Sequence, residues 1–271
     1  LREAAQSISE VVNSAKNIDD SSRAAAMYID ILVKVLSSPP NSAGYLDRLV
    51  SWCDKKNAII GSLNYDMLIE NSCDANNCTW DYGLDQWSCR QNVSFNKQSI
   101  NLIKLHGSIN WSGSLDDVII HDSPPEIKRW RRSNASMIFG GQDGKLRVDG
   151  PFLHLRYAFE KSLNKSNRLI IVGYSFSDAH INSILRRWVT TRTKAKMIIV
   201  DPGTVDFGLN VFQQSYTDKE KERFKTVDIV HIKRTAAEGI DKALAVSDSR
   251  FNPNYEHKNG FLPHILVTRI E

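Results

Sequence analysis

Hydrophobic and polar positions follow one another along this chain in the order typical of strands that alternate with helices. Continuous apolar runs lie at 58–63, 100–105 and 168–173, and runs of this length are typical of strands buried on both faces. From residue 151 onward the predicted elements are helix 151–163, strand 168–173, helix 178–191, strand 196–200, helix 217–224, strand 227–232 and helix 235–246. Strand–helix–strand units of this length join parallel strands through right-handed crossovers.

Helix 178–191 has the clearest helical period. Its apolar residues recur at i, i+3, i+4, i+7 and i+8, and they are Ile181, Ile184, Leu185, Trp188 and Val189. Asp178 precedes them and is the expected N-cap. Two further helices are predicted before the first strand, at 21–37 and from 41 or 42 through 52.

Two long polar segments interrupt the pattern. Segment 73–97 is rich in Asn and aromatic residues, and we interpret it as a surface excursion between two core strands. Segment 112–150 is a second excursion, with glycine turn signals and a strand at 118–121. The predicted fold class is therefore α/β, a Rossmann-like parallel sheet with helices on both faces and irregular excursions between strands.

Composition and charge narrow the class of protein. With 41% hydrophobic and 24% charged residues among 271, the chain is typical of soluble globular proteins. The net charge of +4 is mild, and we interpret the densest basic run, 128–132, as a solvated face rather than a nucleic-acid patch. No stretch has the apolar length of a membrane span. Four cysteines do not form a disulfide framework in so long a chain, so we expect a reducing, cytoplasmic environment.

Polar residues follow each of the three apolar runs directly. The first run leads into Asn64 and Asp66, the second into His106 and Gly107, and the third into 173–178. Parallel strands end at one edge of the sheet, and ligands of open parallel sheets bind beyond the carboxyl ends of the strands. We therefore expect these residues to form one site.

An amide and an imidazole are the most versatile groups in that set. The Asn64 carboxamide can donate to and accept from a sugar hydroxyl or a water, although an Asn in this place also closes a βα turn. His106 exchanges a proton near neutral pH and is the natural general base, with a structural turn histidine as the alternative. Asp66 has the alternative role of a helix cap, and Gly107 permits a tight turn or the close approach of a ligand.

The third cluster is a strand-to-helix turn suited to part of a nucleotide. Its backbone N–H groups and the Ser175 hydroxyl can hold a phosphate or a ribose. Asp178 at the helix start competes with an anion, which favours ribose or adenosine over pyrophosphate. Asp201 follows the next strand, where dinucleotide folds place the acidic residue that binds ribose hydroxyls. An ordinary Asp-Pro-Gly turn is the alternative at that position.

Three motifs in this order resemble the sirtuin family. They are Ser-Leu-Asn-Tyr-Asp at 62–66, Leu-His-Gly-Ser-Ile-Asn-Trp at 105–111 and Gly-Tyr-Ser-Phe-Ser-Asp at 173–178. The resemblance covers residues 57–201 and is strongest to the bacterial sirtuin-like branch that consumes NAD during antiphage defence. It implies that residues 1–250 form a sirtuin-like NAD-binding domain and that 251–271 form a C-terminal extension.

The resemblance also implies roles for individual residues. Asn64 and His106 match the family's catalytic pair. The expected cofactor-binding residues are Ser62, Asp66, Gly173, Ser175, Phe176 and Asp201. Within that set, the resemblance places Asp66 near the nicotinamide end, Gly173 and Ser175 near the adenosine ribose or the phosphates, and Asp201 near the adenosine end.

Three departures from the family pattern bear on the reaction. The family's opening Gly-Ala-Gly turn has no counterpart, and the chain starts at Leu1 without a Met, so we expect the N-terminal strand with its phosphate turn to lie upstream. Deacetylating sirtuins have a Gln where this chain has Leu63. They also carry a four-cysteine zinc module after the His-Gly motif, whereas Cys73, Cys78 and Cys89 precede that motif here and lack paired zinc spacing. No metal is therefore expected.

The resemblance and its departures imply an NAD glycohydrolase that cleaves its substrate NAD to nicotinamide and ADP-ribose, or a cyclic form of it. The implied biological role is the toxic effector of a bacterial antiphage defence system. The alternatives are an NAD-dependent protein deacylase or ADP-ribosyltransferase, and a non-catalytic module that binds NAD or ADP-ribose. The expected partners are further copies of this chain in a homo-oligomer and a HerA-type ATPase, an Argonaute-like protein or a phage-sensing protein.

Overall fold

Two sheets organise the computed structural model, which describes residues 33, 36–37, 44–87, 92–113, 117–124, 135–137, 150–192, 195–203, 217–224, 226–248 and 264–267. The larger sheet has seven strands in the order β2-β3-β1-β10-β7-β8-β9, and every neighbouring pair is parallel. The smaller sheet has three antiparallel strands in the order β5-β4-β6.

The bounds of these elements are as follows. The strands of the larger sheet are β1 (Ile59–Ser62), β2 (Trp80–Asp81), β3 (Ile100–Lys104), β7 (Arg168–Val172), β8 (Ala195–Val200), β9 (Val227–Ile232) and β10 (His264–Val267). Those of the smaller sheet are β4 (Gly107–Gly113), β5 (Val118–Ile120) and β6 (Ala135–Met137). The helices are η1 (Gly44–Leu46), α3 (Asp47–Lys56), α4 (Leu68–Ala75), α7 (Phe152–Leu163), α8 (Ala179–Thr191), α10 (Asp218–Phe224) and α11 (Ala236–Asp248).

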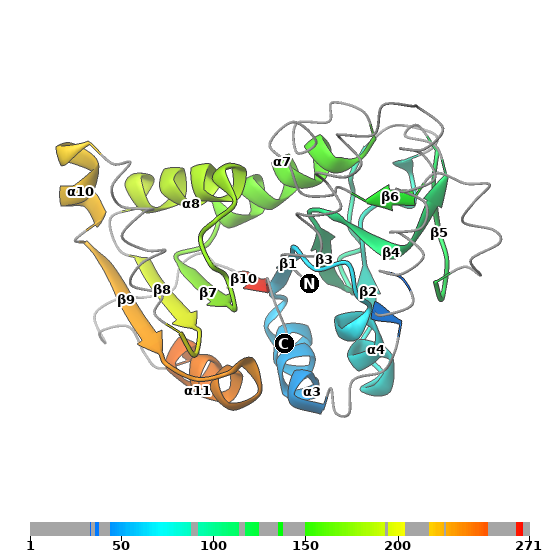
Figure 1. The fold of residues 1–271 in the computed structure, drawn as a ribbon, viewed down its shortest axis with the longest axis horizontal. Coiled ribbons are helices and arrows are strands. Elements are labelled where there is room, and N and C mark those ends of the chain that lie inside the picture. The colour runs from blue at the N-terminus through cyan, green and yellow to red at the C-terminus, as the bar shows by residue number, and fades with distance from the viewer. Residues whose placement is uncertain are drawn as a thin grey trace, which may run out of the picture.

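Helices cover both faces of the larger sheet. In Figure 1, α7 and α8 run along one side of it, and α3 and α11 run along the other. This arrangement confirms the predicted α/β class with a parallel sheet between helix layers. Among the described helices, none is long and apolar enough to cross a bilayer.

The predicted elements after residue 151 are all present, with ends that differ by a few residues. Asp178 caps α8 as expected, because its Oδ1 accepts hydrogen bonds from the backbone N–H groups of His180 at 2.9 Å and Ile181 at 3.2 Å. The helix predicted at 41–52 occurs as η1 and α3. Most of the helix predicted at 21–37 lies outside the described residues.

Part of segment 73–97 is buried, which corrects its interpretation as a surface excursion. β2 joins the edge of the larger sheet beside β3, and the side chains of Tyr82 and Trp87 are each only 2% exposed. Aromatic side chains bury a large apolar area, so burial of its few large rings holds this polar segment against the core.

Strand β4 was not predicted from the sequence. It begins at Gly107, whose φ of +88° turns the chain out of the larger sheet.

β10 occupies the middle of the larger sheet, although it lies in segment 251–271, which was predicted to be a C-terminal extension outside the domain. It pairs in parallel with β1 on one side and β7 on the other. If β10 is counted as the first strand, the order from β3 to β9 is 3-2-1-4-5-6, the order of dinucleotide-binding folds. The strand order reverses at this place, which is where such sheets open a ligand crevice.

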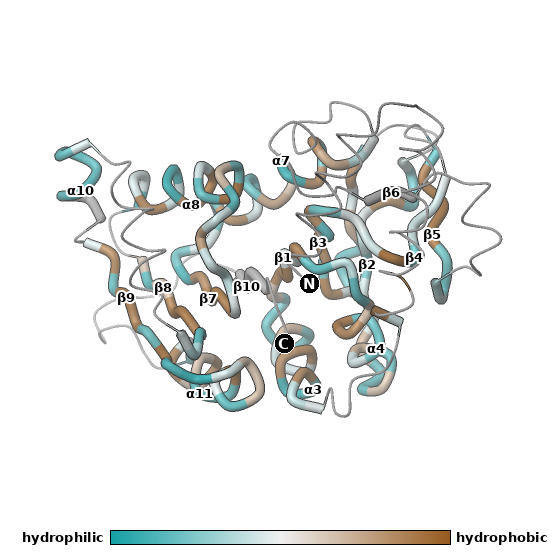
Figure 2. The backbone as a smooth tube through the Cα atoms, viewed as in Figure 1, coloured by the Kyte–Doolittle hydropathy of each residue, from teal (hydrophilic) through white to brown (hydrophobic). Residues whose placement is uncertain are grey.

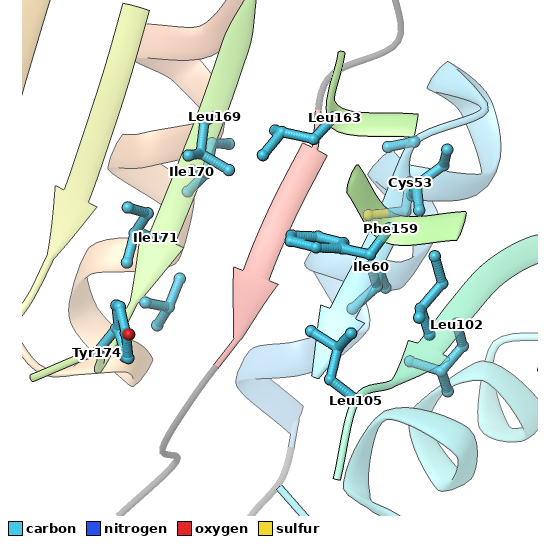
Figure 3. Packing of buried hydrophobic residues seen from close by; sticks show 14 of the residues in the cluster. Cys53, Ile60, Leu102, Leu105, Phe159, Leu163, Leu169, Ile170, Ile171 and Tyr174 are labelled. Carbon is cyan, nitrogen blue, oxygen red and sulfur yellow. The ribbon is translucent and has the colours of Figure 1, made fainter. Parts of the chain in front are cut away.

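The two helix layers and the sheet share one continuous hydrophobic core. Figure 2 shows the strands β7 and β8 as predominantly hydrophobic, in contrast to the hydrophilic α10. Figure 3 shows Phe159 reaching from α7 toward the sheet near Ile60 and β10. The packing is closest at Gly61, where an added Cβ would lie 2.6 Å from Cε2 of Phe159. Only a residue without a side chain fits under this ring.

Gly61→Ala therefore places a methyl group inside the contact radius of Phe159. We expect it to lower the free energy of unfolding by about 1–3 kcal/mol, the usual cost of overpacking a core. The measurement is chemical denaturation, with Gly44→Ala as the control, because a Cβ at Gly44 meets nothing closer than 3.7 Å. Phe159→Leu should recover part of the loss in the double variant. Equal effects at the two glycines would contradict the packing described here.

Candidate active site

The turns that follow β1 and β3 lie side by side. The two strands pair in parallel with Ser62 opposite Lys104. Asn64 and His106 each come two positions after that pair, one on each turn. Parallel pairing therefore brings the amide and the imidazole to the same edge of the sheet.

Two backbone hydrogen bonds hold these turns together on either side of His106. The N–H of Leu105 donates to the carbonyl oxygen of Ser62, and the N–H of Ile109 donates to that of Tyr65, both at 2.9 Å. The rings of Tyr65 and His106 have their centroids 6.4 Å apart. The chain that carries Asn64 is thus fixed to the chain that carries His106.

Ser62 and Asp66 shape the first turn from within. The Ser62 side chain is buried, and its Oγ accepts a hydrogen bond of 3.2 Å from the N–H of Asn64. Oδ1 of Asp66 accepts one of 3.1 Å from the N–H of Leu68 at the start of α4. Asn64 itself is partly exposed. These hydrogen bonds close the turn, while the side-chain amide of Asn64 remains partly exposed to solvent.

The imidazole of His106 lies against the carboxylate of Asp178. Its Nε2 lies 3.2 Å from Oδ2 of that carboxylate, and the two side chains are 18% and 6% exposed. An ionised carboxylate only accepts hydrogen bonds, so in a neutral ring this contact favours the tautomer with its hydrogen on Nε2, which leaves Nδ1 as the acceptor. Asp178 is therefore placed to orient the imidazole of the candidate base.

This contact crosses the sheet. His106 follows β3 and Asp178 precedes α8 after β7, and in the sheet β1 and β10 lie between those two strands. Figure 3 shows Leu105 and Tyr174, which belong to the second and third motifs, at the end of the sheet where the arrows of β1, β7 and β10 terminate. The second and third motifs therefore meet at the switch point of the strand order.

The turn at 173–178 is held by the Tyr174 side chain and by Asn182 of α8. Phe176 has a φ of +54° and a buried side chain. Its carbonyl accepts from Nδ2 of Asn182, and Oδ1 of Asn182 accepts from the Tyr174 hydroxyl, both at 2.7 Å. Burial, together with the charge of Asp178, raises the pKa of Tyr174, so its hydroxyl stays protonated and donates. The Ser175 hydroxyl is exposed and lies 2.9 Å from that of Ser177.

Gly173 and Asp201 lie next to each other at the ends of β7 and β8. The N–H of Gly173, whose φ is +64°, donates to the carbonyl oxygen of Val200 at 2.9 Å. Oδ1 of Asp201 accepts from the N–H of Gly203 at 2.8 Å, which is the hydrogen bond of an Asp turn. The Asp201 side chain stays partly exposed beyond the strand.

The structure thus sorts the predicted residues into three groups. Asn64 and His106 lie on bonded neighbouring turns, with Asp178 against the imidazole. Ser175 and Asp201 present polar atoms at the ends of β7 and β8. The side chains of Ser62, Asp66 and Phe176 are buried within their turns, and Gly173 lies beside Asp201 with only its backbone to offer.

Within the described part of the chain, no group of His, Cys, Asp and Glu side chains is arranged to hold a metal ion. Cys53 and Cys73 are buried free thiols, and burial raises the pKa of both. Cys89 lies outside the described residues.

Sequence reasoning missed two residues of this region. It assigned Asp178 only to the helix cap, since the contact with His106 depends on the fold. It also passed over Lys104, which the apolar run 100–105 places in a buried strand. The sequence does hold a signal for this residue: a charged side chain within an apolar run indicates a buried polar contact, because a buried ammonium needs polar partners.

Asp178→Asn separates the two roles of Asp178. Asn caps helices about as well as Asp, so we expect unfolding free energy within about 0.5 kcal/mol of the wild type, whereas Asp178→Ala should lose about 1 kcal/mol. The amide of Asn donates where the carboxylate accepted, so the proton of His106 should move from Nε2 to Nδ1. Nitrogen NMR of the imidazole measures this. An unchanged tautomer in Asp178→Asn would contradict the assigned contact.

A family model and two solved structures were found to be similar to this chain. Residues 58–225, more than half of the chain, match the family described as "SIR2-like domain". No curated protein matches the sequence. A solved triple mutant of a Sir2 homologue in complex with 2'-O-acetyl ADP ribose is 16% identical, with 87% of this chain and 78% of that chain covered and a TM-score of 0.50. A structure of Sir2Af2 bound to a myristoylated histone peptide is 12% identical, with 90% and 96% covered and a TM-score of 0.44. The chain belongs to the SIR2-like family.

Proposed function

We propose that this protein is an NAD glycohydrolase that cleaves the bond between nicotinamide and ribose. The observation that carries the proposal is the pairing of Asn64 and His106 on turns joined by backbone hydrogen bonds, with Asp178 against the imidazole. Membership of the SIR2-like family supports NAD as the substrate. The ligand of the solved Sir2 homologue, 2'-O-acetyl ADP ribose, contains the ADP-ribose part of NAD.

The reaction converts NAD⁺ and water to nicotinamide, ADP-ribose and one proton. The bond between ribose C1' and the nicotinamide nitrogen breaks, and its electron pair leaves with the nitrogen. The ribose passes through an oxocarbenium-like state, and the water oxygen forms the new bond to C1'. If a ribose hydroxyl attacks C1' in place of water, the product is cyclic.

Different side chains orient the substrate and accept the proton in this reaction. Asn64 orients the ribose hydroxyls or the attacking water through its carboxamide. His106 takes the proton of the attacking group at Nδ1, since Asp178 holds the hydrogen at Nε2. Ser175 and Asp201 contact the ADP-ribose part of the substrate from the ends of β7 and β8, and Asp66 lies toward nicotinamide. Gly173 allows close approach of the backbone.

Leu63 favours hydrolysis over deacylation. Deacetylating sirtuins have a Gln at the corresponding motif position, whereas the Leu63 side chain is apolar and packs against the hydrophobic core. It has no polar group to offer an acyl-lysine or the ribose. Water is then the simplest acceptor for the ADP-ribosyl group.

We further propose that the chain acts as the toxic effector of a bacterial antiphage defence system and consumes cytoplasmic NAD. The three motifs that resemble the NAD-consuming defence branch support this role. Such an effector has to stay inactive until it is assembled, so the proposal includes a homo-oligomer and a sensing partner such as a HerA-type ATPase, an Argonaute-like protein or a phage-sensing protein.

Asn64→Ala and His106→Ala should each lower the rate of nicotinamide release by about a hundredfold or more, because general acid–base groups contribute roughly 10²–10⁴. The measurement uses the full-length protein in its native assembly. Asn71→Ala and His154→Ala are matched controls, since both side chains are exposed on α4 and α7, and both should keep wild-type rates. Wild-type release in both Asn64→Ala and His106→Ala would overturn the assignment.

The same assay separates the alternatives. Mass detection of a deacylated or ADP-ribosylated peptide without free ADP-ribose would favour a deacylase or ADP-ribosyltransferase. Tight NAD binding with no nicotinamide release, even with partner and trigger present, would favour a non-catalytic binding module.

A further inference from the structure

A fully buried ammonium, that of Lys104, contacts the turn that carries Asn64. The side chain of Lys104, on β3, is 1% exposed, and that of Glu70, on α4, is 0% exposed. Their Nζ and Oε1 atoms are 3.4 Å apart. Nζ of Lys104 also donates a hydrogen bond to the backbone carbonyl oxygen of Asp66. One side chain therefore connects a strand, a helix and the turn between β1 and α4.

Glu70 extends this connection toward the smaller sheet. The Tyr82 hydroxyl donates to Oε1 of Glu70 at 2.7 Å and lies 3.3 Å from Oδ1 of Asn110. Burial and the charge of Glu70 raise the pKa of Tyr82, so the hydroxyl keeps its proton. Nδ2 of Asn110, on β4, donates to the carbonyl oxygen of His121 at 2.7 Å. The network thus reaches the strand that continues directly from His106.

The position of Lys104 relates it to both candidate catalytic residues. Lys104 comes two residues before His106 on the same backbone, and its ammonium binds the carbonyl of Asp66, two residues after Asn64. Movement of the first turn relative to β3 would break this hydrogen bond in a medium without water to replace it.

Stability alone does not account for the network. A buried ion pair is often no more stabilising than well-packed apolar residues, because desolvation offsets the attraction. Oε2 of Glu70 is buried and has no hydrogen-bond partner within the described part of the chain. An unsatisfied buried carboxylate oxygen is a cost that a purely structural pair would avoid.

We propose that Lys104 is a positioning residue for NAD cleavage: its buried ammonium, balanced by Glu70, fixes the Asp66 carbonyl and thereby holds Asn64 at a set distance from His106. This inference rests on the proposed function. Lys104 does not contact the substrate and acts only through the backbone of the turn.

The test compares two paired substitutions. Lys104→Met with Glu70→Gln removes both charges, keeps the length of both side chains and leaves an oxygen for the Tyr82 hydroxyl, so no charge is stranded in the core. Lys196→Met with Asp228→Asn is the control for removing a charge pair as such; its side chains are more exposed, 12% and 56%. That pair has the same 3.4 Å separation but joins β8 and β9 at the far side of the sheet. Glu70→Gln alone, which keeps the ammonium, completes the set.

Three quantities are measured on the full-length protein in its native assembly: the rate of nicotinamide release as kcat and KM, unfolding by heat, and backbone hydrogen exchange. For Lys104→Met/Glu70→Gln we expect a kcat lowered by about tenfold to a hundredfold with KM nearly unchanged, because a small misplacement of catalytic groups costs this much. Exchange should rise at 63–68 and stay unchanged in β7 and β8. Glu70→Gln should lower kcat less than the double variant, because the ammonium still binds the Asp66 carbonyl, but it should unfold at the lowest temperature, because that ammonium has lost its carboxylate. The control pair should match the wild type.

The outcomes separate this inference from the proposed function. A folded Lys104→Met/Glu70→Gln variant with kcat within twofold of the wild type and unchanged exchange at 63–68 overturns the positioning role. If the wild-type protein itself releases no nicotinamide, the proposed function fails and the positioning role in NAD cleavage fails with it; exchange then shows only whether Lys104 holds the turn of Asn64, which a rise confined to 63–68 supports and no rise overturns. Loss of folding in Lys104→Met/Glu70→Gln, with the control pair intact, makes the pair structural and also overturns it.

Discussion

The parallel register between β1 and β3 is the constraint on which the site depends. Ser62 lies opposite Lys104, and the same offset carries the chain to Asn64 on one strand and to His106 on the other. A slip of one residue would turn every side chain of a strand to the opposite face. Asn64 and His106 would then point to different sides of the sheet. Burial on both faces makes such a slip costly, because the strands pack against α7 on one side and α3 on the other.

The register brings Asn64 and His106 to the same edge of the sheet, and polar contacts add directional restraints on their side chains and turns. Hydrophobic burial holds the strands, but it is not directional and cannot orient an imidazole or an amide. Asp178 contacts the imidazole from across the switch point, and the ammonium of Lys104 binds the carbonyl of Asp66 in the turn that carries Asn64. In the central place of the sheet, between β1 and β7, lies β10, which comes from residues 264–267. The candidate site is therefore built from segments spread over most of the sequence.

The sequence predicts the fold well where one pattern dominates. The period of α8 and its Asp178 cap, and the apolar runs of β1, β3 and β7, give these elements to within a few residues. Predictions fail where contacts between distant parts of the chain determine which residues are buried or which strands form. Tyr82 and Trp87 lie in a polar segment, and only the fold shows that they are buried. β4 depends on the positive φ of Gly107, and β10 is a short strand whose place is set by the gap between β1 and β7. For the site, local motifs identify Asn64 and His106, whereas the contact of Asp178 with His106 needs three-dimensional proximity.

The most direct test of this account is a crystal structure of the full-length His106→Ala variant with NAD bound. The account predicts that the nicotinamide ribose lies at the carboxyl ends of β1 and β3, within hydrogen-bond distance of the Asn64 carboxamide, and that the space left by the imidazole faces the C1' atom beside Asp178. NAD bound elsewhere, or an Asn64 side chain that faces a different cavity from residue 106, would contradict it.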